Sequence, residues 1–194
     1  WLFKNQIWSV KNNEQKVYLT FDDGPIPEVT PWVLEVLAQH DVKATFFCIG
    51  DNVKKNKAVY EQVLQAGHKI GNHTFNHLKG WETATDLYLE NVEKCEKELT
   101  NKDKLFRPPY GKIKPLQSKT LRKRGFKIIM WDVLSEDYNV DITPEMCLKN
   151  VLDNAESGSI IVFHDSLKAY KNLKYALPKT IVALKNKGMK FDVI

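Results

Sequence analysis

The chain has 194 residues, of which 43% are hydrophobic, and this is enough to bury one sizeable core. It contains no run of about 18 apolar residues, so we expect no membrane span. The net charge of +5 is modest for this size, and its excess is local. The three cysteines are odd in number and widely spaced, which predicts small buried side chains rather than a disulfide framework.

Residues 1–194 are expected to form a single domain and a monomer, with residues 1–16 as a short lead-in that carries Trp1, Phe3 and Trp8. No secretory signal pattern is present. The chain begins at Trp1 rather than Met, which is compatible with a trimmed product of a secreted or cell-envelope protein. A cytoplasmic location also stays open, so the sequence leaves the compartment unknown.

Apolar runs and helical repeats alternate along the chain. Strands are predicted at 16–21, 44–49, 68–72, 105–106, 127–132, 159–163 and 190–194. Helices are predicted near 30–37, 58–66, 83–100, 115–124, 143–155 and 173–187. Thr30 and Thr143 are the expected caps of two of these helices, and Pro178 is expected to start or kink the last one. Strict alternation predicts a parallel sheet with helices outside it.

Polar side chains follow the carboxyl ends of the predicted strands. They are Asp22, Asp23, His73, Arg107, Asp132 and His164. In a barrel such strand ends ring one mouth, where enzymes of this fold work. An open sheet would spread them along an edge tens of Å long, since strands are about 5 Å apart. The sequence therefore predicts a small α/β barrel that is incomplete, with about seven strands.

Asp22 and Asp23 stand between a β-prone run and the turn residues Gly24 and Pro25. Adjacent carboxylates at a buried strand end need a counter-charge, which a metal, an arginine or both can supply. A surface turn is the alternative interpretation. His73 and His77 are four residues apart and can meet one cation. Two histidines and one carboxylate leave positions open for water and substrate, as in catalytic metal sites.

Only one of the two aspartates need bind the metal, and the other is then free to act as a general base. The residues alone do not say which aspartate has which task. Arg107 stands before a stiff Pro-Pro pair and can hold that base ionised, although a surface ion pair is the alternative. His164 follows four apolar residues and supplies the missing general acid, unless it is a satisfied core histidine.

Basic residues concentrate between positions 102 and 127, where Asp103 is the one acid. A solvated helix face is the usual explanation of such a stretch. A surface for an anionic polymer or a lipid phosphate is a weaker one. The stretch lacks the interleaved aromatic platform of nucleic-acid-binding proteins, so nucleic acid is not an expected partner.

Five segments match a known family in that family's order. They are Thr20-Phe21-Asp22-Asp23-Gly24, His73-Thr74-Phe75-Asn76-His77, Arg107-Pro108-Pro109-Tyr110-Gly111, the region Trp131 to Tyr138, and Val162-Phe163-His164. The chain resembles the polysaccharide deacetylases of carbohydrate esterase family 4, which include chitin, peptidoglycan and nodulation-factor deacetylases. The resemblance spans Thr20 to Asp165 and implies a distorted, incomplete (β/α) barrel that forms one catalytic domain.

The resemblance also implies roles for individual residues. A divalent metal, commonly zinc and alternatively cobalt or another divalent ion, is implied at Asp23, His73 and His77. The implied catalytic residues are Asp22 as base, Arg107 as its orienting partner, the backbone amide of Tyr110 at the oxyanion, and His164 as acid. The implied reaction is hydrolytic removal of acetate from N-acetylglucosamine in a glycan of the peptidoglycan or chitin type.

Two positions depart from the family pattern. The fourth segment usually reads Asp-x-x-Asp-Trp, and its first Asp tunes the acidic histidine; here these places hold Leu134, Asp137 and Tyr138. Either Asp132 or Asp137 can substitute for the missing carboxylate. Val162 stands where Leu often lines the acetyl pocket. The candidates for the substrate pocket are Pro109, Trp131, Asp137, Tyr138 and Val162.

Two other functions stay open. The first is the deacylation of a lipid-linked or other acylamino sugar, which the basic stretch and the altered fourth segment permit. The second is an inactive carbohydrate-binding relative. The retained Asp22, Asp23, His73, His77, Arg107 and His164 argue against that one, because a degenerate site tends to lose its acids first.

Overall fold

The computed structural model describes residues 5–100 and 102–194, and Trp1 and Phe3 of the predicted lead-in lie outside these ranges. Within them the chain forms eight strands, seven α-helices and one short 3-10 helix. In chain order these are β1 Lys16–Asp22, α1 Thr30–Gln39, β2 Thr45–Cys48, α2 Gly50–Lys55, α3 Lys57–Gln65, β3 Lys69–Asn72, α4 Thr85–Glu96, β4 Leu105–Phe106, η1 Pro109–Gly111, α5 Pro115–Lys123, β5 Lys127–Ile128, β6 Val133–Leu134, α6 Pro144–Leu152, β7 Ile160–His164, α7 Tyr170–Asn186 and β8 Lys190–Asp192.

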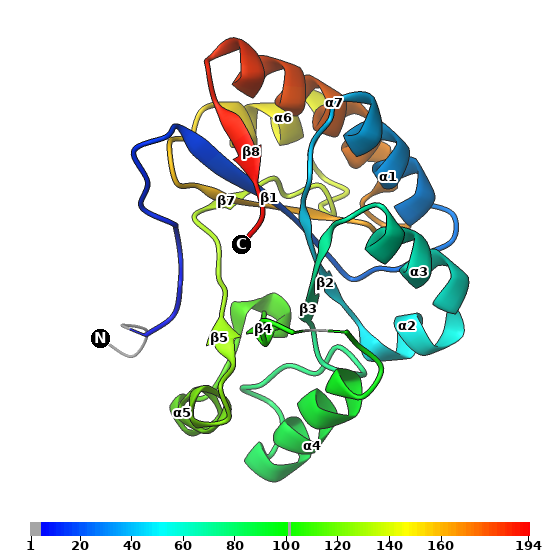
Figure 1. Cartoon of the computed structure of the whole chain (residues 1–194), viewed down its shortest axis with the longest axis vertical. Helices are drawn as coiled ribbons and strands as arrows, with labels where there is room; N and C mark the ends of the chain where they lie inside the picture. The colour runs from blue at the N-terminus through cyan, green and yellow to red at the C-terminus, as the bar shows by residue number, and fades with distance from the viewer. Residues whose placement is uncertain (1–4, 101) are drawn as a thin grey trace.

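All the paired strands run parallel, in the order β5-β4-β3-β2-β1-β7-β6, and β8 pairs with the amino end of β1. The sheet curls into a half-barrel, with the helices on its outer side (Figure 1). This confirms the predicted distorted, incomplete (β/α) barrel. The register sets Asp22 directly opposite Phe47 of β2 and His164 of β7, so several strands end at the same level.

The predicted strand at 127–132 is wrong in one respect. Only its first two residues, Lys127 and Ile128, form a strand, β5. Strand β6 begins just after the predicted run, at Val133, and lies at the opposite edge of the sheet, so residues 129–132 cross from one edge to the other and form the seam crossing. Ile7 of the N-terminal segment forms a bridge with Ile129 in this crossing, and Ser9 forms one with Ser159. The predicted run is apolar because Ile129 and Met130 of the seam crossing are buried in the barrel. Buried residues outside a strand give the same apolar sequence pattern as a continuous strand.

The helices agree with expectation at one cap and differ from it at three other places. Thr143 caps α6 as predicted, because its hydroxyl accepts a hydrogen bond from the Met146 amide. Thr30 is not the cap; it is the first residue of α1, after Val29, and its hydroxyl donates to Asp165. Helix α7 begins at Tyr170 and continues through Pro178, so the proline does not start it. Helix α2 was not predicted, since its six residues are too few to show a helical repeat.

Strand β1 is buried on both faces. Its residues Val17, Leu19 and Phe21 belong to the cluster that joins the sheet to the helices, and Tyr18 belongs to the cluster inside the half-barrel. Alternation along a strand then turns Thr20 and Asp22 to the same inner side as Tyr18. The three cysteines are buried and free, as predicted. Among the described residues no helix combines the length and apolar character needed to span a membrane.

Candidate metal and catalytic site

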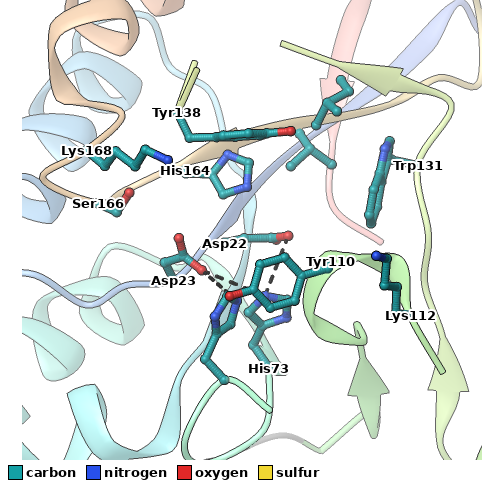
Figure 2. Close-up of a pocket in the computed structure, with 13 residues that line it drawn as sticks. Asp22, Asp23, His73, Tyr110, Lys112, Trp131, Tyr138, His164, Ser166 and Lys168 are labelled. Atoms are coloured by element: carbon teal, nitrogen blue, oxygen red, sulfur yellow. Dashed lines mark ion pairs between the residues drawn. The ribbon is translucent and has the colours of Figure 1, made fainter. Parts of the chain in front are cut away.

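The predicted side chains meet around one cavity of about 570 Å³ at the carboxyl ends of the strands (Figure 2). Its walls include the predicted residues Asp22, Asp23, His73, His77, Tyr110, Trp131, Tyr138, Val162 and His164. Leu134 also lines it, together with three polar residues that were not singled out, Lys112, Ser166 and Lys168. Arg107, Pro109 and Asp137 are buried and lie outside this lining.

Asp23, His73 and His77 bring three ligand atoms within 4.8 Å of one another. The Oδ1 atom of Asp23 lies 3.3 Å from Nε2 of His77 and 3.8 Å from Nε2 of His73. Ligands of a tetrahedral zinc ion are separated by about 3.3 Å, given bonds of about 2.0 Å. The same Asp23 oxygen is buried and has no hydrogen-bond partner among the described residues. A buried carboxylate oxygen without a partner is costly, and a cation at this point would satisfy it.

The two histidines present the atoms that a cation needs. Nδ1 of His73 lies 2.8 Å from the Arg107 carbonyl oxygen; a proton on Nδ1 donates to that oxygen and leaves the lone pair on Nε2. Burial lowers the pKa of His77 to about 4, with help from the charge of His73 and against the charge of Asp23. His77 is therefore neutral at pH 7 and can donate a lone pair. The donor set of two imidazoles and one carboxylate fits zinc or another divalent ion.

Backbone conformation at the mouth is unusual. Asp23, Thr74, His77 and Tyr110 all have a positive φ, of 84°, 63°, 56° and 60°. Each such residue costs on the order of 1 kcal/mol and persists only where its surroundings enforce it. The amide of Phe75 and that of Asn76 both donate to the side chain of Asn91 on α4, which holds the loop between the two histidines.

Asp22 is 3% exposed and forms an ion pair with the fully buried Arg107, whose Nη1 lies 2.7 Å from Oδ1 of Asp22. The other guanidinium donors bind the hydroxyl of Thr20 and the carbonyl oxygens of Ile129 and Met130. Burial raises the pKa of Asp22, but the positive charge of Arg107, with those of His73 and His164, outweighs it and leaves the pKa below 3.8. Asp22 thus remains ionised although it is buried.

His164 is held by Asp137. Nδ1 of His164 lies 2.8 Å from Oδ1 of Asp137, and the His164 amide donates to Oδ2 of the same carboxylate at 2.7 Å. Burial lowers the pKa of His164, but the charge of Asp137 and its hydrogen bond, with Asp23 and Asp22 adding, raise the pKa to about 9. Asn172 of α7 donates to the Asp137 carbonyl oxygen and fixes this turn against the helix.

Of the two carboxylates that the sequence left open beside Leu134, Asp137 therefore contacts His164. Asp132 accepts hydrogen bonds from the Ser159 hydroxyl and the Ile160 amide, at the beginning of β7. The carboxyl end of that strand is His164, about 13 Å further along at 3.3 Å per residue. The expectation that Asp132 lies at the mouth is thus wrong, because the strand predicted to carry it is the seam crossing.

Sequence reasoning missed Asp165. This buried carboxylate accepts hydrogen bonds from the amide of Gly24 and the hydroxyl of Thr30, and so holds the turn that follows Asp23. A Cβ atom at Gly24 would lie 1.9 Å from Oδ2 of Asp165, which excludes any other residue there. The only sequence signal was its place next to His164 at the end of an apolar strand.

The fold and this cluster define a barrel protein with a candidate metal centre at its mouth. The family model described as polysaccharide deacetylase matches residues 9–129. A peptidoglycan-N-acetylglucosamine deacetylase of Bacillus cereus is 38% identical over 193 residues, which cover 96% of this chain and 90% of that protein. The chain therefore belongs to the polysaccharide deacetylases, carbohydrate esterase family 4.

Solved structures show the same relationship. The crystal structure of the Bc1960 peptidoglycan N-acetylglucosamine deacetylase has a TM-score of 0.93 and 35% identity, and covers 98% of this chain and 91% of that one. A family pseudoenzyme from Bacillus anthracis, BA3943, has a TM-score of 0.85 and 28% identity, over 97% of this chain and 67% of that one. Fold alone therefore does not establish activity, and the side chains at the site have to carry that argument.

Proposed function

We propose that this protein is a metal-dependent deacetylase that removes acetate from N-acetylglucosamine residues of a glycan of the peptidoglycan or chitin type. One observation carries the proposal. A buried, unpartnered oxygen of Asp23 faces two imidazoles, next to an ionised Asp22 and a His164 whose pKa is raised to about 9. The ionised Asp22 and the protonated His164 therefore flank the candidate cation site. Amide hydrolysis requires such a base and such an acid.

In this proposal Asp23, His73 and His77 hold the divalent ion, zinc by its donor set. When bound, such an ion polarises the acyl carbonyl and lowers the pKa of a neighbouring water. Asp22 takes a proton from the attacking water, and Arg107 keeps Asp22 ionised and oriented for that step. The backbone amide of Tyr110 stabilises the negative charge that develops on the carbonyl oxygen.

His164 completes the reaction by donating a proton from Nε2 to the amide nitrogen, since its Nδ1 is occupied by Asp137. The C–N bond then breaks, because the nitrogen leaves as a neutral amine. The products are acetate and a glucosamine residue. Trp131, Tyr138, Val162 and Leu134 form the apolar walls of the pocket that receives the acetamido sugar. Pro109 is buried beside Tyr110 and supports its turn.

Two alternatives stay testable. A lipid-linked acylamino sugar is the first: of the basic stretch that permits it, Arg107 is fully buried in its ion pair with Asp22, whereas most of the lysines remain exposed. An inactive relative is the other alternative, and the existence of a family pseudoenzyme keeps it relevant. The intact ion pair of Asp22 and the intact contact of His164 with Asp137 argue against it.

Metal removal is the first test. After treatment with a chelator, the protein is expected to release no acetate from peptidoglycan fragments, and zinc or cobalt should restore the release. Metal analysis of the reconstituted protein should find a single ion per chain, as one set of three protein ligands predicts. The variant Asp23→Asn should not be restored by the same ions. Activity that survives complete removal of metal, or a protein that binds no divalent ion, would contradict the proposal.

The pH profile tests the role of His164. The acid must carry its proton, so activity should persist up to about pH 9 and fall as the pH rises through the pKa of His164. Asp137→Asn removes the charge that opposes burial, so the high-pH limb should move to lower pH, and kcat at pH 8 should fall about 10-fold or more. Asp132→Asn is the matched control and should leave the limb in place. Parent and variants are compared at the same metal content per chain. If the high-pH limb of the activity profile stays in place in Asp137→Asn, the role of His164 as an acid tuned by Asp137 is contradicted.

A further inference from the structure

The mouth of the pocket carries an ammonium group on each of two opposite sides. Lys112 and Lys168 both line the cavity, and Figure 2 shows them on opposite sides of the group formed by Asp22, Asp23 and Tyr110. Each lies over an aromatic ring. Nζ of Lys112 is 5.3 Å from the centroid of the Trp81 ring, and Nζ of Lys168 is 5.7 Å from that of Tyr138.

These two ammonium groups have no carboxylate partner within the described ranges 5–100 and 102–194. None of the ion pairs found there involves Lys112 or Lys168. Of the two acids that line the pocket, Asp22 is paired with Arg107 and Asp23 belongs to the candidate metal centre, and Asp137 outside the lining is engaged by His164. Lys79 differs, because it also lies near an aromatic ring at the mouth but is paired with Glu82.

The aromatic rings beside the two lysines suit a sugar. Trp81 is 53% exposed, and its indole nitrogen donates to the Ile113 carbonyl oxygen, which fixes the ring at the surface. An exposed, fixed ring offers an apolar face to the C–H groups of a pyranose. The ammonium group of Lys112 lies over the ring and adds attraction for a negative charge on a sugar that packs against the rest of the exposed indole. A neutral acetamido sugar would use the ring but not the cation.

We propose that Lys112 and Lys168 are specificity-determining residues that bind carboxylates on the sugars flanking the one whose acetamide enters the pocket. The substrate class is then an amino-sugar polymer that bears free carboxylates, such as the lactyl carboxylate of a muramic acid without a stem peptide, in preference to a neutral polymer of N-acetylglucosamine. This inference rests on the proposed deacetylase function. Lys112 and Lys168 would select the substrate by its charge, in addition to the apolar contacts in the pocket. Neither lysine belongs to the metal centre or to the acid–base pair.

The test compares kcat/KM for acetate release from three oligosaccharides of equal length: an alternating N-acetylglucosamine–muramic acid oligomer, its carboxyl methyl ester, and a chitin oligomer. Lys112→Met and Lys168→Met should each lower kcat/KM for the acidic oligomer about threefold to fivefold, through KM, as expected for one exposed ion pair. The ester and the chitin oligomer should be unaffected. The preference of the parent for the acidic oligomer should also shrink as salt is raised from about 0.05 to 0.5 M.

Lys119→Met, on the exposed side of α5 away from the pocket, is the matched control and should change none of the three values. Equal losses on acidic and neutral oligomers, or an unchanged preference in the double variant Lys112→Met, Lys168→Met, would overturn the inference while leaving the deacetylase function intact. Acetate from none of the three oligomers with metal restored would instead overturn the proposed function.

Discussion

Replacing Asp22 with Asn is expected to lower kcat for deacetylation about 10²–10⁴-fold, the range that a general base contributes. The amide of Asn keeps an oxygen that can accept the hydrogen bond from Nη1 of Arg107, but it cannot take a proton from water. The variant should keep its divalent ion, because the clustered ligand atoms belong to Asp23, His73 and His77. Acetate release and metal content measured on the same preparation check both statements.

The matched variant is Asp23→Asn at the adjacent position. It should lose the ion first, and its activity should fall as a consequence. Both variants should lose activity, so their metal content and not their activity distinguishes the roles of the two aspartates. A variant Asp22→Asn with parental kcat would contradict the role of base. If Asp22→Asn rather than Asp23→Asn loses the ion, the two assignments have to be exchanged.

Replacing Arg107 with Met is expected to destabilise the fold by about 3–5 kcal/mol, the usual cost of breaking a buried ion pair on one side. The change leaves Asp22 buried without a counter-charge and removes the donors to the carbonyl oxygens of Ile129 and Met130 in the seam. Denaturant unfolding of parent and variant measures the difference. Arg124→Met is the control: its ion pair with Glu93 is exposed and should contribute less than about 1 kcal/mol.

The same variant has a pH signature. In the parent the pKa of Asp22 lies below 3.8, so its contribution to stability is fully present above that pH and is lost as the pH falls through the folded pKa. The difference in unfolding free energy between parent and Arg107→Met should therefore narrow below about pH 4. Without Arg107 the pKa of Asp22 rises, so the acid limb of the activity profile should move to higher pH. If Arg107→Met has the same unfolding free energy as the parent at pH 7, the ion pair of Arg107 with Asp22 does not stabilise the fold.

Much of the fold follows from patterns that are local in the sequence. Residues 160–163 are apolar throughout, and residues 17–21 are apolar except for Thr20, because both faces of a parallel strand are buried; the polar residues that follow these runs mark the strand ends. Parallel strands bring their carboxyl ends to one side, so the meeting of Asp22, His73 and His164 was predictable without a structure. The family motifs added the expected division of tasks between the two aspartates.

Other features depend on contacts between residues far apart in the chain, and the local pattern does not contain them. Arg107 counts in the sequence as one more residue of a basic stretch, yet it is the largest fully buried side chain described. Its burial depends on Thr20 and Asp22 of β1 and on carbonyl oxygens of the seam. The two lysines at the mouth likewise have no motif, because only the curvature of the sheet sets them across the pocket from each other.

The sequence by itself determined the class of fold and most of the strand ends that carry the chemistry, because the spacing of apolar residues along a strand decides these. The resemblance to the family supplied the choice of Asp23, with His73 and His77, for the candidate metal centre. Only the tertiary structure decided which carboxylate stands beside His164. Asp132 and Asp137 are five residues apart and chemically alike, so their spacing cannot separate them. The segment that carries both crosses the open edge of the barrel, and this crossing leaves Asp132 at the amino end of β7 and brings Asp137 to its carboxyl end.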